Sequence, residues 1–127
     1  MHATYSYDYA IIRLVPSVER GECLNVGVIL FCPTRRFLGA LVYLDQQRLS
    51  LFAPQLDFAA VQEQLEHLVQ ICHGKAESDP IGRLSQSERF HWLVAPRSTI
   101  IQTSPVHTGL CSDPEITLQQ LLEKLVR

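Results

Sequence analysis

The stretch Leu24–Cys32 reads Leu-Asn-Val-Gly-Val-Ile-Leu-Phe-Cys and sets the architecture of the chain. Its apolar residues follow one another almost without interruption, which is typical of a strand in the middle of a sheet. Gly27 inside this run predicts a β-bulge or the close approach of another backbone segment. The sequence therefore predicts a central, mostly buried strand at this position.

Two further strands are predicted on either side of this stretch. The run Tyr9–Val15 is apolar and rich in β-branched residues, and it ends at Pro16. On the other side, residues 33–36 (Pro-Thr-Arg-Arg) are a turn signal that is followed by a third strand at Phe37–Leu44. The second and third strands are joined by so few residues that we expect an antiparallel hairpin.

A helix is predicted after the hairpin, beyond a short helical or irregular connection at Asp45–Phe52. We expect it to begin after Asp57, whose side chain can cap free N–H groups, and to end at Gly74, which can adopt the left-handed conformation. Apolar residues recur in this segment at spacings of three and four, which indicates one buried helical face. These residues are Phe58, Val61, Leu65, Leu68, Val69 and Cys72.

The last third of the chain has weaker signals. Residues 75–87 are polar and interrupted by proline and glycine, and we expect an ordered loop. Phe90–Val94 and Ser98–Thr103 are predicted as two more strands. Asp113-Pro114 is a typical helix start, with a cap residue followed by proline in the first turn, and the residues after it have the apolar spacing of a helix.

These elements predict an α+β fold. A single layer of about five mainly antiparallel strands, covered by two helices, would bury every apolar face identified above. The length of 127 residues suits one domain, and we expect residues 1–127 to form it.

Composition limits the classes of function. The net charge of −2 argues against general attraction to polyanions, so nucleic-acid binding through Arg20, Arg35 and Arg36 has little support. No basic and apolar leader and no apolar run of about 20 residues occurs in the sequence, so we expect neither secretion nor a membrane span. The four cysteines form no Cys-x-x-Cys pair, which favours free thiols in the cytoplasm.

No catalytic or ligand-binding signature occurs in the chain. Phosphate-binding loops, dinucleotide fingerprints, zinc-protease and nucleophile-elbow motifs are missing, so the sequence does not establish that the protein is an enzyme. Cys72, His73, His91, His107 and Cys111 lack the short fixed spacings of a zinc site, and we predict neither a metal nor a cofactor.

One group of polar residues is a candidate site. If the strand ends converge, arginines, a histidine and hydroxyls would surround a phosphate or carboxylate, and a glutamate would balance the charge. The members are Arg13, Glu22, Arg89, Arg97, Ser98, His107 and Thr108. His107, expected in a loop flanked by proline and glycine, is the candidate acid or base. The alternative is that these side chains pair internally and fix loops, as buried polar groups must.

Two blocks of the sequence resemble a known family. Residues 7–16 (Tyr-Asp-Tyr-Ala-Ile-Ile-Arg-Leu-Val-Pro) and 19–30 are similar to the opening of the bacterial family catalogued as domain of unknown function 3037. Residues 89–93, 95–98 and 107–109 are similar to its second block. The resemblance spans nearly the whole chain and implies no activity. It points to a kinase resembling the HipA toxin as a partner.

Two functional hypotheses follow from the sequence. The first is a small regulatory or protein-interaction module that acts through a protein partner or as a homo-oligomer. The alternative is an enzyme or binding domain for a phosphorylated or carboxylated small molecule. In that case Arg13, Arg89 and Arg97 would hold the anion, and His107 would transfer a proton.

Overall fold

The computed structural model describes residues 3–75, 79–97 and 99–127. Within these residues the strands form an antiparallel five-stranded sheet in the order β3-β2-β1-β4, and β5 also pairs with β1. The strands are β1 (Tyr5–Leu14), β2 (Leu24–Cys32), β3 (Phe37–Val42), β4 (Ile101–Thr103) and β5 (His107–Cys111). The helices are α1 (Gln46–Phe52), α2 (Phe58–Cys72), α3 (Gln86–Val94) and α4 (Pro114–Leu125), with short 3-10 helices η1 (Pro33–Arg35) and η2 (Pro80–Arg83).

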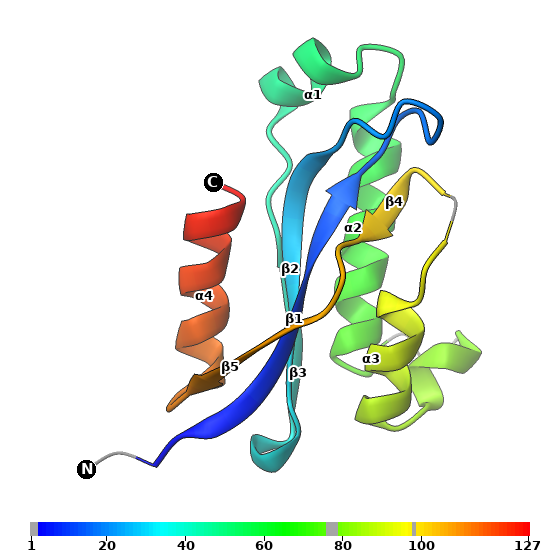
Figure 1. Ribbon diagram of the computed structural model, residues 1–127. Helices are drawn as coiled ribbons and strands as arrows, with labels where there is room; N and C mark the ends of the chain where they lie inside the picture. The colour runs from blue at the N-terminus through cyan, green and yellow to red at the C-terminus, as the bar shows by residue number, and fades with distance from the viewer. Residues whose placement is uncertain (1–2, 76–78, 98) are drawn as a thin grey trace.

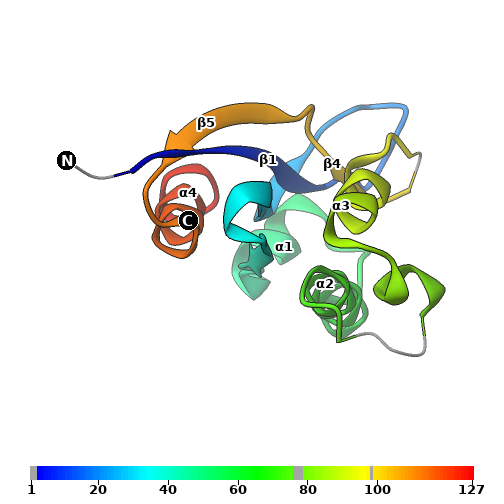
Figure 2. The same ribbon diagram turned by 90° about the horizontal axis from the view of Figure 1, so that it is seen from below.

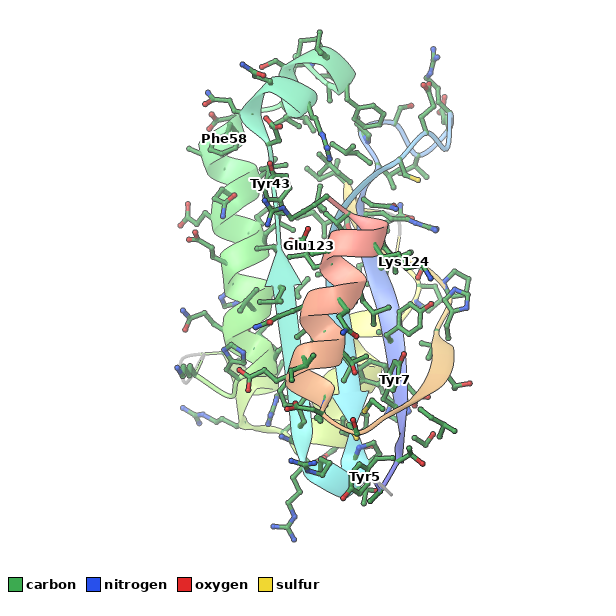
Figure 3. All side chains as sticks on the ribbon, turned by 90° about the vertical axis from the view of Figure 1, so that its left-hand side faces the viewer. Tyr5, Tyr7, Tyr43, Phe58, Glu123 and Lys124 are labelled. Atoms are coloured by element: carbon green, nitrogen blue, oxygen red, sulfur yellow. The ribbon has the colours of Figure 1, made fainter. Side chains whose placement is uncertain are left out.

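Helices cover both faces of the sheet (Figure 1). On one face, α2 and α3 pack over a core that includes Ile29 and Phe31 of β2, and the Phe31 and Phe90 rings lie 5.2 Å apart. On the other face, α4 covers a second core around Val28 and Leu30 of the same strand. Tyr5 and Tyr7 of β1 belong to this second side (Figure 3). Because β2 is buried on both faces, its apolar residues are nearly continuous in sequence.

A β-bulge interrupts the pairing of β1 with β2. Ile12 lies opposite Gly27, but Arg13 lies opposite Asn25, so Val26 is the additional residue of β2. Gly27 is also a point of close approach, because a Cβ there would lie 2.8 Å from the carbonyl oxygen of Leu41. Both expectations for this glycine are confirmed.

The other side of β1 is divided between two strands. β4 pairs with Ile12–Leu14, and β5 pairs with Tyr5–Tyr9 in a register shifted by one residue. Ser104 lies in the break and is buried. Its hydroxyl accepts a hydrogen bond from the Ile11 N–H (2.8 Å), and its own N–H donates to the Ile11 carbonyl (2.8 Å). The side chain thus satisfies a donor that the shifted register would leave unpaired.

Most of the predicted elements are confirmed. The first three strands, the turn between β2 and β3 and the helices α2 and α4 occur at the predicted positions, although β1 begins at Tyr5 instead of Tyr9. The connection at Asp45–Phe52, expected to be helical or irregular, contains the helix α1. Gly74 follows the end of α2 with a left-handed φ of 69°, and Asp113 caps α4 with Pro114 in the first turn. Asp57 occupies the cap position of α2, but its side chain makes no capping hydrogen bond.

The predictions for residues 85–111 need correction. Phe90–Val94 is not a strand but the second half of α3. Within Ser98–Thr103 the ladder is limited to Ile101–Thr103, and Ser98 lies outside the described residues. His107 is not in a loop, because it begins β5. The sheet therefore has about the predicted number of strands, but β5 replaces the expected strand at 90–94, and α3 joins α2 on one face.

None of the helices in the described part of the chain is both long and apolar enough to cross a membrane.

The four cysteines differ in exposure. Cys23 is exposed, whereas Cys32, Cys72 and Cys111 are buried.

This difference predicts the reactivity of the thiols. In the native protein a single thiol, that of Cys23, should react rapidly with an aromatic disulfide reagent, because the other three are shielded from solvent. All four should react in denaturant. The Cys23→Ser variant should show no rapid phase, and a rapid native reaction in that variant would contradict the described core.

Candidate functional site

Arg89, one of the predicted anion ligands, is bound to backbone carbonyls. It lies on α3 and is 9% exposed. Its Nη1 donates to the carbonyl of Leu84 at 2.6 Å, and its Nη2 donates to the carbonyl of Cys72 at 3.3 Å. The guanidinium therefore joins the end of α2 to the segment before α3. These contacts support the internal alternative for this residue.

Arg97 also contacts the backbone. Its Nη2 donates to the carbonyl of Trp92 at 2.6 Å, and its Nε contacts the carbonyl of Ala95 at 3.4 Å. The guanidinium carbon lies 4.8 Å from the centre of the Trp92 ring, within the range of a cation–π contact. Arg97 thus satisfies carbonyls at the C-terminus of α3 and holds the indole from one side.

Arg13 and Glu22 lie elsewhere. Arg13 is half-buried in β1, between Asn25 of β2 and Gln102 of β4, and its Nε is buried without a hydrogen-bond partner among the described residues. Glu22 is exposed in the β1–β2 connection and forms an ion pair with Arg20. It lines a small cavity of about 210 Å³.

His107 and Thr108 are exposed on β5. The His107 ring lies 5.3 Å from the ring of Tyr9, and Thr108 pairs with Asp8 of β1. The described members of the predicted group thus occupy a helix junction, a helix end, the sheet, a hairpin and a sheet edge. The structure does not bring them to one cavity. Whether His107 transfers protons stays a prediction.

Arg97 also lines a groove between α2, α3 and β4, with a volume of about 640 Å³. Its wall combines exposed side chains of α2 with the C-terminal end of α3. The lining residues are Glu63, Gln64, Glu66, His67, Leu68, Gln70, Ile71, Trp92, Leu93, Arg97, Thr99 and Ile101. We call it the α2–α3 groove.

The floor of the α2–α3 groove is apolar. Leu68, Ile71 and Leu93 are buried core residues whose edges face the groove. Trp92 beside them is 39% exposed, an unusual degree for so large an apolar ring that is already fixed by Arg97. A ligand that covers this indole would bury apolar surface without having to order a mobile side chain.

The α2 side of the groove carries acids. Glu63 and Glu66 are exposed there, and His67 Nε2 lies 3.0 Å from Asp79 Oδ2. The N–H of Ile81 and the His67 ring hold the pKa of Asp79 below its ordinary value, so this carboxylate stays charged. The exposed charge of this side is therefore negative, whereas the charge of Arg97 is directed at carbonyls.

The chemistry of the α2–α3 groove suits binding. The hydroxyl of Thr99 donates to the carbonyl of Ile101 at 2.8 Å, and the described residues that line the groove include no cysteine, serine or tyrosine. Among the described residues no cluster of three or more His, Cys, Asp or Glu side chains is arranged to hold a metal ion. The sequence alone does not predict this groove, because the apolar residues around Trp92 also suit a strand.

The fold defines an α+β domain in which an antiparallel sheet lies between helices. The chain belongs to the family described as protein of unknown function (DUF3037), whose model matches residues 9–126, as the resemblance of the two sequence blocks indicated. No curated protein and no solved structure matches it.

The contacts of Arg89 predict a structural role. Replacement of Arg89 by Leu should lower the free energy of unfolding by about 2 to 4 kcal/mol, because two carbonyls lose a charged donor in a buried setting. Arg127→Leu is the control, since its ion pair with Glu123 is exposed and should contribute less than about 1 kcal/mol. Urea denaturation measures both. Equal losses in the two variants would contradict this role.

Cys72 predicts a dependence of stability on pH. Burial raises the pKa of its thiol from 9.0 to about 12, and the Arg89 guanidinium lowers it in part. The contribution of this buried thiol to the free energy of unfolding is fully present below pH 9, where the thiol is protonated in both the folded and the unfolded state. Above pH 9 only the unfolded chain ionises, so stability should fall by about 1.4 kcal/mol per pH unit toward pH 12.

Urea denaturation between pH 8 and about pH 10.5, with Cys72→Ala for comparison, isolates this contribution from that of the other titrating groups. The difference in slope between wild type and variant is the expected result. Parallel slopes would mean that the native thiol ionises as readily as the unfolded one.

Proposed function

We propose that the protein is a protein-interaction module that binds an apolar and basic segment of a partner protein in the α2–α3 groove. The observation that supports this function best is the half-exposed Trp92, held over an apolar floor by Arg97. Tryptophan and arginine are enriched among the residues that dominate the energies of protein interfaces.

The partner's chemistry follows from the two sides of the groove. Its floor favours a bulky apolar side chain that covers the Trp92 indole. Glu63 and Glu66 on α2 favour a lysine or arginine next to that anchor. A short segment with this pair of features, helical or extended, would fill the groove. The kinase resembling HipA is the first candidate partner, and the cytoplasm is the expected location.

The alternative, a pocket for a phosphorylated or carboxylated small molecule, has less support. Arg89 and Arg97 already donate to carbonyl oxygens, so an anion would have to compete for these donors. An acidic α2 side would also repel it. The same charge argues against nucleic acid in the α2–α3 groove.

The experiment uses Trp92 as its own reporter, because it is the only tryptophan of the chain. A display library of random 12-residue peptides is selected on the wild-type protein, and tryptophan-free versions of the selected peptides are titrated against it. We expect consensus sequences with a bulky apolar residue beside Lys or Arg, and a change in Trp92 fluorescence on binding.

Variants then locate the site. Trp92→Ala should weaken binding at least about tenfold through lost apolar contact, and Glu63→Lys should do so through reversed charge. Because Trp92→Ala removes the fluorescent reporter, its binding is measured by the anisotropy of a labelled peptide. Glu115→Lys is the matched control, since Glu115 is an exposed glutamate on α4 away from the groove. Selected peptides that bind both groove variants as tightly as the wild type would overturn the proposal.

A further inference from the structure

The two edges of the sheet differ in exposure. β3 forms one edge, and Leu38 and Ala40 there are only 5% and 1% exposed. α2 and α4 both pack against this strand, one on each face. An additional strand could not reach the backbone of Ala40 without displacing its cover. The β3 edge is therefore closed.

The opposite edge is divided between β4 and β5, and its β5 part is open. Leu110 is 72% exposed and Val106 is 42% exposed, and His107 and Thr108 are exposed as well. Figure 2 shows β5, in orange, along the outer border of the molecule with no helix outside it. We call this border the β5 edge.

The hydrogen bonds of β1 determine which groups of β5 face outward. The Val15 N–H donates to the Ile100 carbonyl, and the Ser104 N–H donates to the Ile11 carbonyl. The backbone N–H and C=O groups of the odd-numbered residues of β1 therefore point toward β4 and β5. Tyr7 and Tyr9 must follow this alternation, and they pair with Gly109 and His107.

It follows that Thr108 and Leu110 direct their N–H and C=O groups away from β1. No hydrogen bond between described residues uses these groups. They form a row of free donors and acceptors along the β5 edge.

Sheet edges usually carry features that prevent pairing with another chain. Lysines, inward-pointing charges, prolines and bulges serve this purpose. The strand itself, His-Thr-Gly-Leu-Cys, has no Lys, Arg, Asp, Glu or Pro. An exposed leucine at its most accessible position has the opposite effect, because it adds apolar surface to the free row.

We propose that the β5 edge binds the β5 edge of a second copy of this chain. In the antiparallel arrangement, Gly109 of each copy lies on the two-fold axis. Thr108 of one copy then exchanges backbone hydrogen bonds with Leu110 of the other, and the second Thr108–Leu110 pair follows by symmetry. The two sheets become one continuous sheet.

Self-pairing is favoured by what the strand offers. The strand contains no Lys, Arg, Asp or Glu, and His107 is charged only when it is protonated. Two copies of the strand therefore meet without repulsion between Lys, Arg, Asp or Glu side chains. Each Leu110 packs beside a threonine, a β-branched cross-strand neighbour. At the centre of the pairing, Gly109 has no side chain that the two copies would have to accommodate. The Tyr7 ring occupies the place of such a side chain, since a Cβ at Gly109 would lie 2.6 Å from Tyr7 Oη.

Sedimentation velocity between about 1 and 200 µM tests this pairing. We expect the apparent mass to rise from 14.4 kDa toward twice that value as concentration increases. Leu110→Lys should remain monomeric, because a lysine at the edge opposes strand pairing. Leu51→Lys, which changes an 88% exposed leucine on α1, should dimerise like the wild type. Circular dichroism confirms that each variant is folded.

A double variant tests the register. Thr108→Glu combined with Leu110→Lys places a glutamate of one copy opposite a lysine of the other, twice in the dimer, so it should restore association that Leu110→Lys abolishes. A wild type that is monomeric throughout, a Leu110→Lys variant that dimerises normally, or a double variant that stays monomeric would each overturn the proposal. None of these results depends on the α2–α3 groove.

Discussion

Every strand except β3 hydrogen-bonds to β1, and this strand must satisfy three neighbours at once. It does so with a break in register on each side, the additional Val26 in β2 and the buried Ser104 between β4 and β5. An unpaired N–H in this position would be costly, since it would be buried in the sheet. The hydroxyl of Ser104 removes that cost at Ile11, and so it allows one side of β1 to carry two short strands instead of one long strand.

The division of that side has consequences for both proposed surfaces. β4 remains close to α3 and completes the α2–α3 groove through Ile101, whereas β5 continues past the break to the far end of β1 without a helix outside it. A single uninterrupted strand would follow one line along β1. The break therefore separates a segment that belongs to the groove from a segment that forms the open edge of the sheet.

The sequence was sufficient for the elements with a strong apolar period. It predicted β1, β2, β3, α2 and α4, because burial selects their residues on at least one face. It failed for α3 because Phe90, Trp92 and Leu93 also suit a strand, although Ser85-Gln86-Ser87-Glu88 is a capping box that marks a helix start. β5 has no such period, because most of its side chains are exposed. The polar residues were identified, but not their partners: Arg89 and Arg97 bind carbonyls whose positions depend on how α3 ends, and Trp92 is exposed only because it lies on a helix.

The two surfaces would act together if both serve the functions proposed for them. The β5 edge and the α2–α3 groove share no residue, so pairing through β5 leaves both grooves of a dimer available. Two grooves fixed to one continuous sheet make the second binding event intramolecular for a partner that carries two segments. Apparent affinity would then depend on the concentration of the module as well as on the contacts of Trp92. Such a dependence suits a small regulatory protein, because a change in its own abundance would alter binding without a change in any contact.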